Sequence, residues 1–114
     1  MLMMNAHDPS GVTIRNLGMD DYDAVLRLWT EAGLPFRPLG RDSRASMAVQ
    51  LQRGTAFLLA AELEGELAGV VLGTHDGRKG WINRLAVRPA LRRRGIARLL
   101  VREVEARMSA AGLE

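Results

Sequence analysis

The stretch Leu85-Ala-Val-Arg-Pro-Ala-Leu-Arg-Arg-Arg-Gly-Ile-Ala-Arg98 is the segment that decides the fold of this chain. Its apolar start predicts a strand that stops at Pro89, and the residues after Gly95 predict an amphipathic helix. A helix N-terminus presents unpaired backbone N–H groups and about half a positive charge, so it attracts phosphate. The run Arg92–Arg94 adds side-chain charge, and Gly95 lets a ligand approach the backbone closely. The stretch therefore predicts an anion site suited to a phosphorylated cofactor.

The composition is that of one globular domain. The 114 residues are enough for one hydrophobic core and too few for two domains. No apolar run reaches the roughly 20 residues that a membrane span needs, so we expect no contact with a membrane. The start Met1–His7 lacks the apolar core of a signal peptide, so we expect a disordered tail over residues 1–10 and a domain over 11–114. Cysteine is absent, which excludes disulfides and thiolate metal sites and fits a cytoplasmic location.

Positive charge is concentrated late in the chain. Sixteen basic residues against thirteen acidic ones give a small excess, but eight arginines lie between Arg84 and Arg107. This cluster indicates an anionic partner; the alternative is a solvated helix face with no ligand.

The first half of the chain predicts a strand followed by two helices. Val12–Leu17 alternates as a strand does. Asp20 or Asp21 is expected to cap a helix that ends near Gly33 and has four residues at helical spacing: Tyr22, Val25, Leu26 and Trp29. A loop over residues 34–41 leads to a second helix that stops at Gly54. We expect Asp42 or Ser43 to cap this helix, with Ala48 and Leu51 on its inner face.

The second half predicts three strands and a helix. The apolar runs 56–62 and 67–75 are joined through Glu64-Gly65 and indicate a hairpin. A turn over residues 76–80 leads to a strand over 81–87. The last helix runs from Gly95 to about Ala111, and its apolar stripe is Ile96, Leu100, Val104 and Met108. The predicted fold class is therefore α/β (α+β), with the order β-α-α-β-β-β-α and a mostly antiparallel sheet.

This order and the opening stretch resemble the GNAT superfamily of acyl-CoA-dependent N-acyltransferases. The family signature is Gln or Arg, two variable residues, Gly, one variable residue, then Gly or Ala, and here it stands as Arg92-Arg-Arg-Gly-Ile-Ala97 behind a strand. The resemblance covers Val12–Glu114, and the runs Gly40–Ser43 and Asp76–Arg84 are similar to one bacterial subgroup. The family fold continues past this last helix, so we expect the chain to lack the C-terminal third of that fold.

The resemblance implies that acetyl-CoA is the cofactor. In similar proteins the pyrophosphate lies on backbone N–H groups of the turn and helix start, and the pantetheine arm pairs with the preceding strand. A bulge in that strand is also implied, which would make room for the thioester. We expect Asn83 to share one side of this strand with Trp81, Leu85 and Val87. By motif position, the cofactor-binding residues are Leu85, Ala86, Val87, Arg92, Arg93, Arg94, Gly95, Ile96, Ala97 and Arg98.

The catalytic acid and base are not identified by the sequence. Family members often carry a carboxylate on the strand before the signature, whereas this strand has Asn83, which is expected to position a water or the substrate. The family's usual general acid is a tyrosine that follows the next strand. The single tyrosine here, Tyr22, lies among apolar residues and is expected to be part of the core.

The acceptor is expected to contact Phe36 and Arg37 in the proline-bounded loop, together with Asn83; the alternative for the loop is a purely structural role. His75 is expected to be a polar residue beside a turn, with a titrating role near the acceptor as the alternative. His7 and His75 lie too far apart, without supporting carboxylates, to indicate a metal site.

Three functions compete. The first is an N-acetyltransferase that moves an acetyl group from acetyl-CoA to a primary amine of a small molecule or peptide by direct attack. The second is a non-catalytic, truncated module that binds coenzyme A or pairs through the open edge of strand 81–87, for example as a homodimer. The third, nucleic-acid binding through the arginine cluster, is disfavoured because aromatic stacking residues and a helix–turn–helix pattern are missing.

Overall fold

A computed structural model describes residues 11–35, 40 and 42–113. Over these residues the chain forms a four-stranded antiparallel sheet in the order β1-β2-β3-β4. The strands are β1 (Val12–Asn16), β2 (Ala56–Leu63), β3 (Glu66–His75) and β4 (Gly80–Val87). The helices are α1 (Tyr22–Glu31), α2 (Arg44–Arg53) and α3 (Ile96–Ala110), with 3-10 turns η1 (Met19–Asp21) and η2 (Pro89–Leu91). The predicted fold class and order are therefore confirmed.

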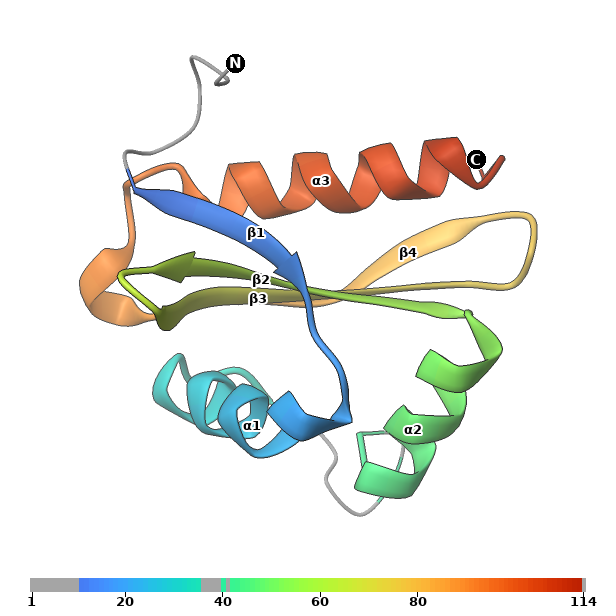
Figure 1. Cartoon of the computed structure of the whole chain (residues 1–114), viewed down its shortest axis with the longest axis horizontal. Helices are drawn as coiled ribbons and strands as arrows, with labels where there is room; N and C mark the ends of the chain where they lie inside the picture. The colour runs from blue at the N-terminus through green and yellow to red at the C-terminus, as the bar shows by residue number, and fades with distance from the viewer. Residues whose placement is uncertain (1–10, 36–39, 41, 114) are drawn as a thin grey trace.

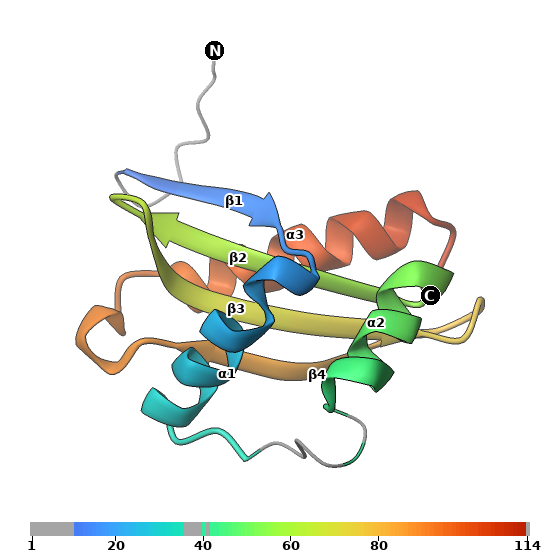
Figure 2. The same ribbon diagram turned by 60° about the horizontal axis from the view of Figure 1, so that its bottom comes forward.

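The helices form layers on both faces of the sheet. Helix α3 covers one face, and α1 and α2 lie against the other (Figures 1 and 2). Side chains alternate along a strand, so Val71 packs toward α3 while its neighbour Val70 packs toward Trp29 of α1 and Met47 of α2. The two apolar clusters share the sheet as a common wall. None of the helices in the described part of the chain is long and apolar enough to cross a membrane.

Helix α3 lies close to the sheet because β3 presents glycines to it. A Cβ atom on Gly73 would lie 2.8 Å from Met108, and one on Gly69 would lie 3.0 Å from Leu100. The predicted stripe of Ile96, Leu100, Val104 and Met108 is buried, and Leu99 joins it.

The β2–β3 hairpin turns as its sequence predicts. Glu64 and Gly65 both have positive φ, at 53° and 81°, which matches the right-handed twist of the flanking strands. The hairpin closes with Leu63 opposite Glu66.

The structure decides between the two expected caps of α2 and adds a residue to its inner face. Ser43 caps the helix by accepting a hydrogen bond from the amide of Ser46, at 3.1 Å. Asp42 does not cap it, because its carboxylate is paired with Arg84. The buried residue of α2 is Met47, which the sequence does not predict. Leu51 is half-buried and packs against the same apolar cluster, as expected, whereas Ala48 is half-buried and is not part of that cluster.

The start of α1 is also corrected. Asp21 stands at the N-cap position, as expected, but its carboxylate makes no cap hydrogen bond to the helix. It accepts instead from the amide of Gly18 at 3.0 Å and from Arg15 at 3.1 Å. The same guanidinium pairs with Glu62 at 2.7 Å, so Asp21 ties the start of α1 to the sheet.

Asp21→Asn is expected to lower the free energy of unfolding by about 1 kcal/mol at pH 7. The hydrogen bond from Arg15 lowers the pKa of Asp21 in the folded protein. The stabilisation is therefore complete above the pKa of an unfolded aspartate, about 4, and is lost as the pH falls through the lower folded value. Urea unfolding at pH 7 and in acid measures this. The difference between wild type and variant should shrink in acid, while Asp20→Asn, which replaces an exposed neighbour, should change little at either pH.

Candidate functional site

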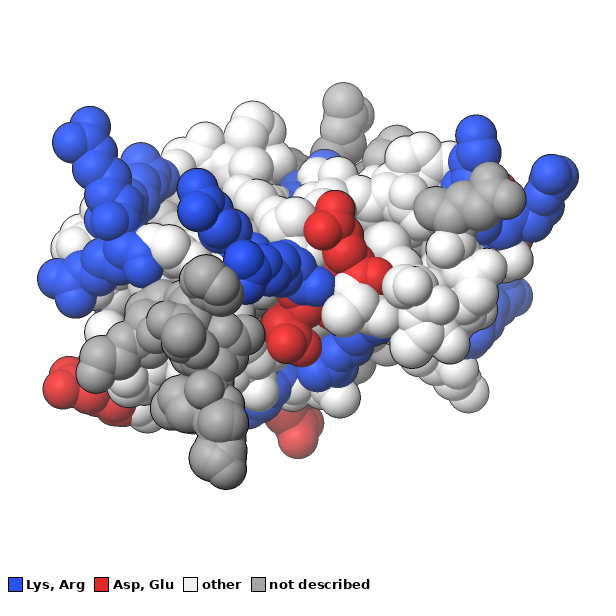
Figure 3. Space-filling model, turned by 90° about the horizontal axis from the view of Figure 1, so that it is seen from above, with Lys and Arg blue, Asp and Glu red and all other residues white. Residues whose placement is uncertain are grey.

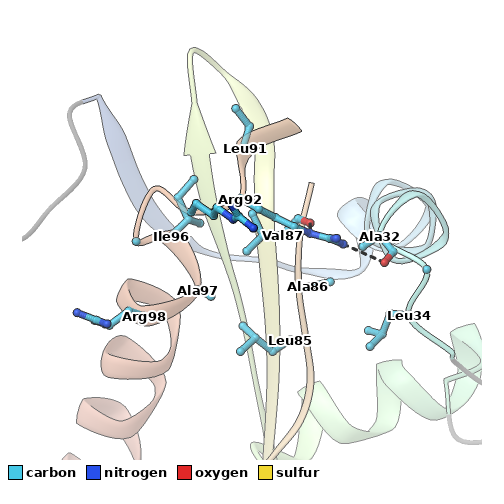
Figure 4. A pocket seen from close by; sticks show the side chains of 13 residues that line it. Ala32, Leu34, Leu85, Ala86, Val87, Leu91, Arg92, Ile96, Ala97 and Arg98 are labelled. Carbon is cyan, nitrogen blue, oxygen red and sulfur yellow. Dashed lines mark hydrogen bonds between the residues drawn. The ribbon is translucent and has the colours of Figure 1, made fainter. Parts of the chain in front are cut away.

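A pocket of about 800 Å³ lies where β4 ends and α3 begins, and we call it the basic pocket. It is closed on one side by the end of α1 (Figure 4). Its lining residues are Ala32, Gly33, Leu34, Leu85, Ala86, Val87, Leu91, Arg92, Arg93, Gly95, Ile96, Ala97 and Arg98.

The backbone of this pocket presents unpaired amides. Arg93 and Gly95 have φ of 68° and 82°, so the chain turns through left-handed conformations just before α3. The amide of Leu99 donates the first hydrogen bond of the helix, to the carbonyl of Gly95 at 3.0 Å. The three preceding amides, of residues 96–98, therefore have no acceptor within the helix. Together with the helix dipole, they form a seat for an anion.

The arginines of this region fall into two groups. Arg92 is bound to the protein, because its Nη2 donates to the carbonyl of Ala32 at 3.0 Å and its Nε to that of Val87 at 3.3 Å (Figure 4). It ties the end of α1 to the end of β4. By contrast, Arg93, Arg94 and Arg98 make no ion pair or side-chain hydrogen bond to any described residue, and basic side chains gather at this end of the molecule (Figure 3).

Strand β4 contains the bulge that the resemblance implies. Leu72 and Gly73 are neighbours in β3, but they pair with Arg84 and Ile82, which leaves Asn83 as the extra residue of β4. The bulge changes the alternation, so the expectation that Asn83 shares a face with Leu85 and Val87 is wrong. Leu85 and Val87 pack on the α3 side, whereas Asn83 lines a pocket together with α2. For Trp81 the expectation is confirmed, because Trp81 pairs with Thr74, which lines the same pocket as Asn83.

That second pocket, the polar pocket, has a volume of about 310 Å³. In it the side-chain oxygen of Asn83 accepts a hydrogen bond from the hydroxyl of Thr74, at 2.6 Å. Its lining residues are Asp42, Gln50, Thr55, Leu72, Thr74, His75, Asn83 and Arg84. Arg84 and Leu85 are adjacent in sequence and line different pockets, so β4 separates the two.

Comparison with known proteins identifies the family. The model of the acetyltransferase (GNAT) family matches residues 22–114. The chain belongs to the GNAT family of acetyltransferases.

Individual relatives agree with this assignment. An acetyltransferase of Pectobacterium atrosepticum is 36% identical over 99 residues, which are 87% of this chain and 69% of the relative. The PaiA N-acetyltransferase of Thermoplasma acidophilum, solved with coenzyme A, is 21% identical with a TM-score of 0.71, over 89% of this chain and 74% of that one. A GNAT acetyltransferase of Brucella melitensis, solved with acetyl-CoA, is 25% identical with a TM-score of 0.64, over 89% and 70%.

In this acetyltransferase, nine of the ten residues predicted to hold the cofactor line one pocket. Arg94 is the exception, because it does not border the basic pocket. The sequence does not predict that Ala32–Leu34 form a wall of the pocket, because nothing in this local sequence connects it to Arg92, 60 residues later. The guanidinium of Arg92 was expected near phosphate, but in the structure it is bound to two backbone carbonyls.

The candidate acceptor residues are only partly brought together. Asn83 lines the polar pocket, whereas Phe36 and Arg37 lie outside the described residues. The sequence does not predict the remaining residues of the polar pocket as acceptor contacts, apart from the alternative role of His75. They come from the loop before α2, from α2, from Thr55 just before β2, from β3 and from Arg84 of β4, and only the fold brings them together.

His75 is fixed as a turn residue of this acetyltransferase. Its Nε2 lies 2.7 Å from the carbonyl of Gly54, which can only accept, and its Nδ1 accepts from the amide of Gly77 at 3.0 Å. This geometry assigns the tautomer with the proton on Nε2. Both ring nitrogens are used by the backbone, which supports the structural interpretation over a titrating role.

Tyr22 is part of the core, as predicted. Its side chain is buried, and its hydroxyl donates to the backbone carbonyl of Asp42 at 2.5 Å. Burial raises the pKa of Tyr22 above its ordinary value, so the phenol stays protonated at neutral pH.

Proposed function

We propose that this acetyltransferase binds acetyl-CoA in the basic pocket and transfers the acetyl group to a primary amine held in the polar pocket. The observation that carries the proposal is the start of α3, where unpaired amides meet the unpaired side chains of Arg93 and Arg98. Relatives of the same fold were solved with coenzyme A or acetyl-CoA, which supports this donor.

The donor is held from its phosphates to its thioester. Its pyrophosphate accepts hydrogen bonds from the amides at Gly95–Ala97, with Arg93 and Arg98 neutralising charge. The pantetheine arm lies along Leu85–Val87. Because β4 is the last strand of the described sheet, its outer edge is open to such strand-like pairing.

The chemistry is direct attack. The neutral amine adds to the thioester carbonyl, whose oxygen becomes negative and is stabilised by a backbone amide of β4 near Leu85. The carbon–sulfur bond then breaks, the amine nitrogen loses its proton to water, and the thiolate leaves and is protonated. Asn83 orients the acceptor, because its side chain lies in the polar pocket beside the strand that holds the donor.

Asn83→Ala is expected to impair transfer to the acceptor without affecting the binding of coenzyme A. Calorimetry should give the same dissociation constant for coenzyme A as wild type, within about twofold. Release of the coenzyme A thiol, followed with a panel of small amines, amino acids and peptides, should show kcat/KM lowered about tenfold, which is roughly 1.4 kcal/mol.

Each half can fail by itself. Wild-type protein that does not bind coenzyme A at millimolar concentration would overturn the donor site, and binding without turnover of any amine would favour a non-catalytic module. Unchanged kinetics in Asn83→Ala would overturn the position of the acceptor. Tight DNA binding that falls steeply with salt and resists coenzyme A would instead favour a nucleic-acid-binding function.

A further inference from the structure

Arg84 supplies the hydrogen bond that the β4 bulge lacks. The extra residue of a bulge is left outside the regular pairing of the strands, so its backbone groups need other partners. Nη1 of Arg84 donates to the carbonyl of Asn83 at 3.0 Å. The side chain next to the bulge therefore closes it.

The guanidinium is held in turn by a buried carboxylate. Nη2 of Arg84 lies 3.0 Å from Oδ2 of Asp42, whose side chain is 2% exposed against 17% for that of Arg84. Asp42 precedes the cap of α2, and its backbone carbonyl accepts from Tyr22 of α1. The bulge is thus connected to both helices on its face of the sheet.

We propose that Arg84 and Asp42 form a positioning pair, which fixes the β4 bulge and with it the angle between the bound thioester and the acceptor. The proposal rests on the proposed function of the two pockets. Asn83, on one side of the pair, lines the polar pocket, and Leu85, on the other side, lines the basic pocket. A change at the bulge moves one pocket relative to the other and lowers the rate of transfer.

Asp42→Asn and Arg84→Lys are expected to lower kcat at least tenfold per folded molecule. The dissociation constant for coenzyme A should stay within threefold, because the amides at the start of α3 are untouched. Lysine keeps the charge of arginine but not the planar fork that reaches both the carbonyl and the carboxylate.

A matched control exists elsewhere in the molecule. Asp23 of α1 and Arg44 of α2 form an ion pair of the same residue types at 2.8 Å, but their side chains are 69% and 59% exposed. Asp23→Asn should leave kcat unchanged. If Asp42→Asn and Arg84→Lys match this control in kcat and lower only the melting temperature, the pair is structural and the proposal is overturned.

Amide NMR spectra separate this proposal from the proposed function. In Asp42→Asn the signals of residues 83–87 should shift, and in Asp23→Asn they should not. If wild type acetylates no amine but these shifts occur, the control of the bulge by Asp42 stands and the proposed function fails. If the signals of residues 83–87 stay in place, the positioning pair fails, whatever the activity of wild type.

Discussion

Gly95→Glu is expected to weaken coenzyme A binding at least 100-fold, about 2.7 kcal/mol. Gly95 has a φ of 82°, a conformation that other residues rarely adopt, and it lies where α3 begins. A glutamate there places a carboxylate against the pyrophosphate and competes for the same amides. Isothermal titration calorimetry with coenzyme A measures the change.

Two further variants separate charge from backbone strain. Gly95→Ala tests the strain alone, because a Cβ atom there meets nothing within 4 Å, and it should weaken binding less than tenfold. Gly112→Glu adds the same carboxylate at a φ of 81° in equally open space beyond the far end of α3, and it should bind coenzyme A as wild type does. If Gly112→Glu weakened binding as much as Gly95→Glu, the seat at the start of α3 would be disproved.

Leu100→Ala is expected to lower the free energy of unfolding by about 2–5 kcal/mol, enough to unfold a marginal domain. The Leu100 side chain is fully buried between α3 and the sheet, and its Cδ1 would lie 3.0 Å from a Cβ on Gly69. Because the strand comes so close, the cavity left by the deletion cannot close easily. Urea unfolding followed by circular dichroism gives the free energy.

Val101→Ala is the matched control for this variant. Val101 is the next residue of the same helix, is only half-buried and belongs to neither apolar cluster. We expect a loss of less than about 1 kcal/mol. An equal loss in both variants would mean that the contact between α3 and β3 is not the main support of the fold.

The parts of the molecule that could be predicted from sequence are local. The strand, turn and helix over 85–98 are specified within fourteen residues by an apolar run, Pro89 and Gly95. The hairpin at Glu64-Gly65 follows from two neighbouring residues. The order of the helices and strands follows from local signals of the same kind. The bulge in β4 is not visible in the local sequence and is implied only by the family resemblance.

The parts that could not be predicted depend on contacts across the sequence. Met47 is the buried residue of α2, but the helix is so polar that its sequence does not indicate which side faces the core. Only packing against the sheet defines that side. The sequence predicts Asp42 to be a helix cap, but in the structure its carboxylate is bound by Arg84, 42 residues later. The sequence predicts Arg92 to be a phosphate ligand, but in the structure its guanidinium donates to the carbonyl of Ala32 at the end of α1. Capping and charge patterns cannot show which of several partners a side chain chooses.

The bulge at Asn83 also has a consequence for how such an enzyme can diversify. It turns Asn83 and Arg84 toward α2, while Leu85 and Val87 stay on the side of α3. Under the proposed function, acceptor preference and donor binding therefore depend on different side chains of one strand. Substitutions of residues that face α2 can change the choice of amine while the residues that hold the donor stay the same. A designer can use the same strategy to alter the acceptor.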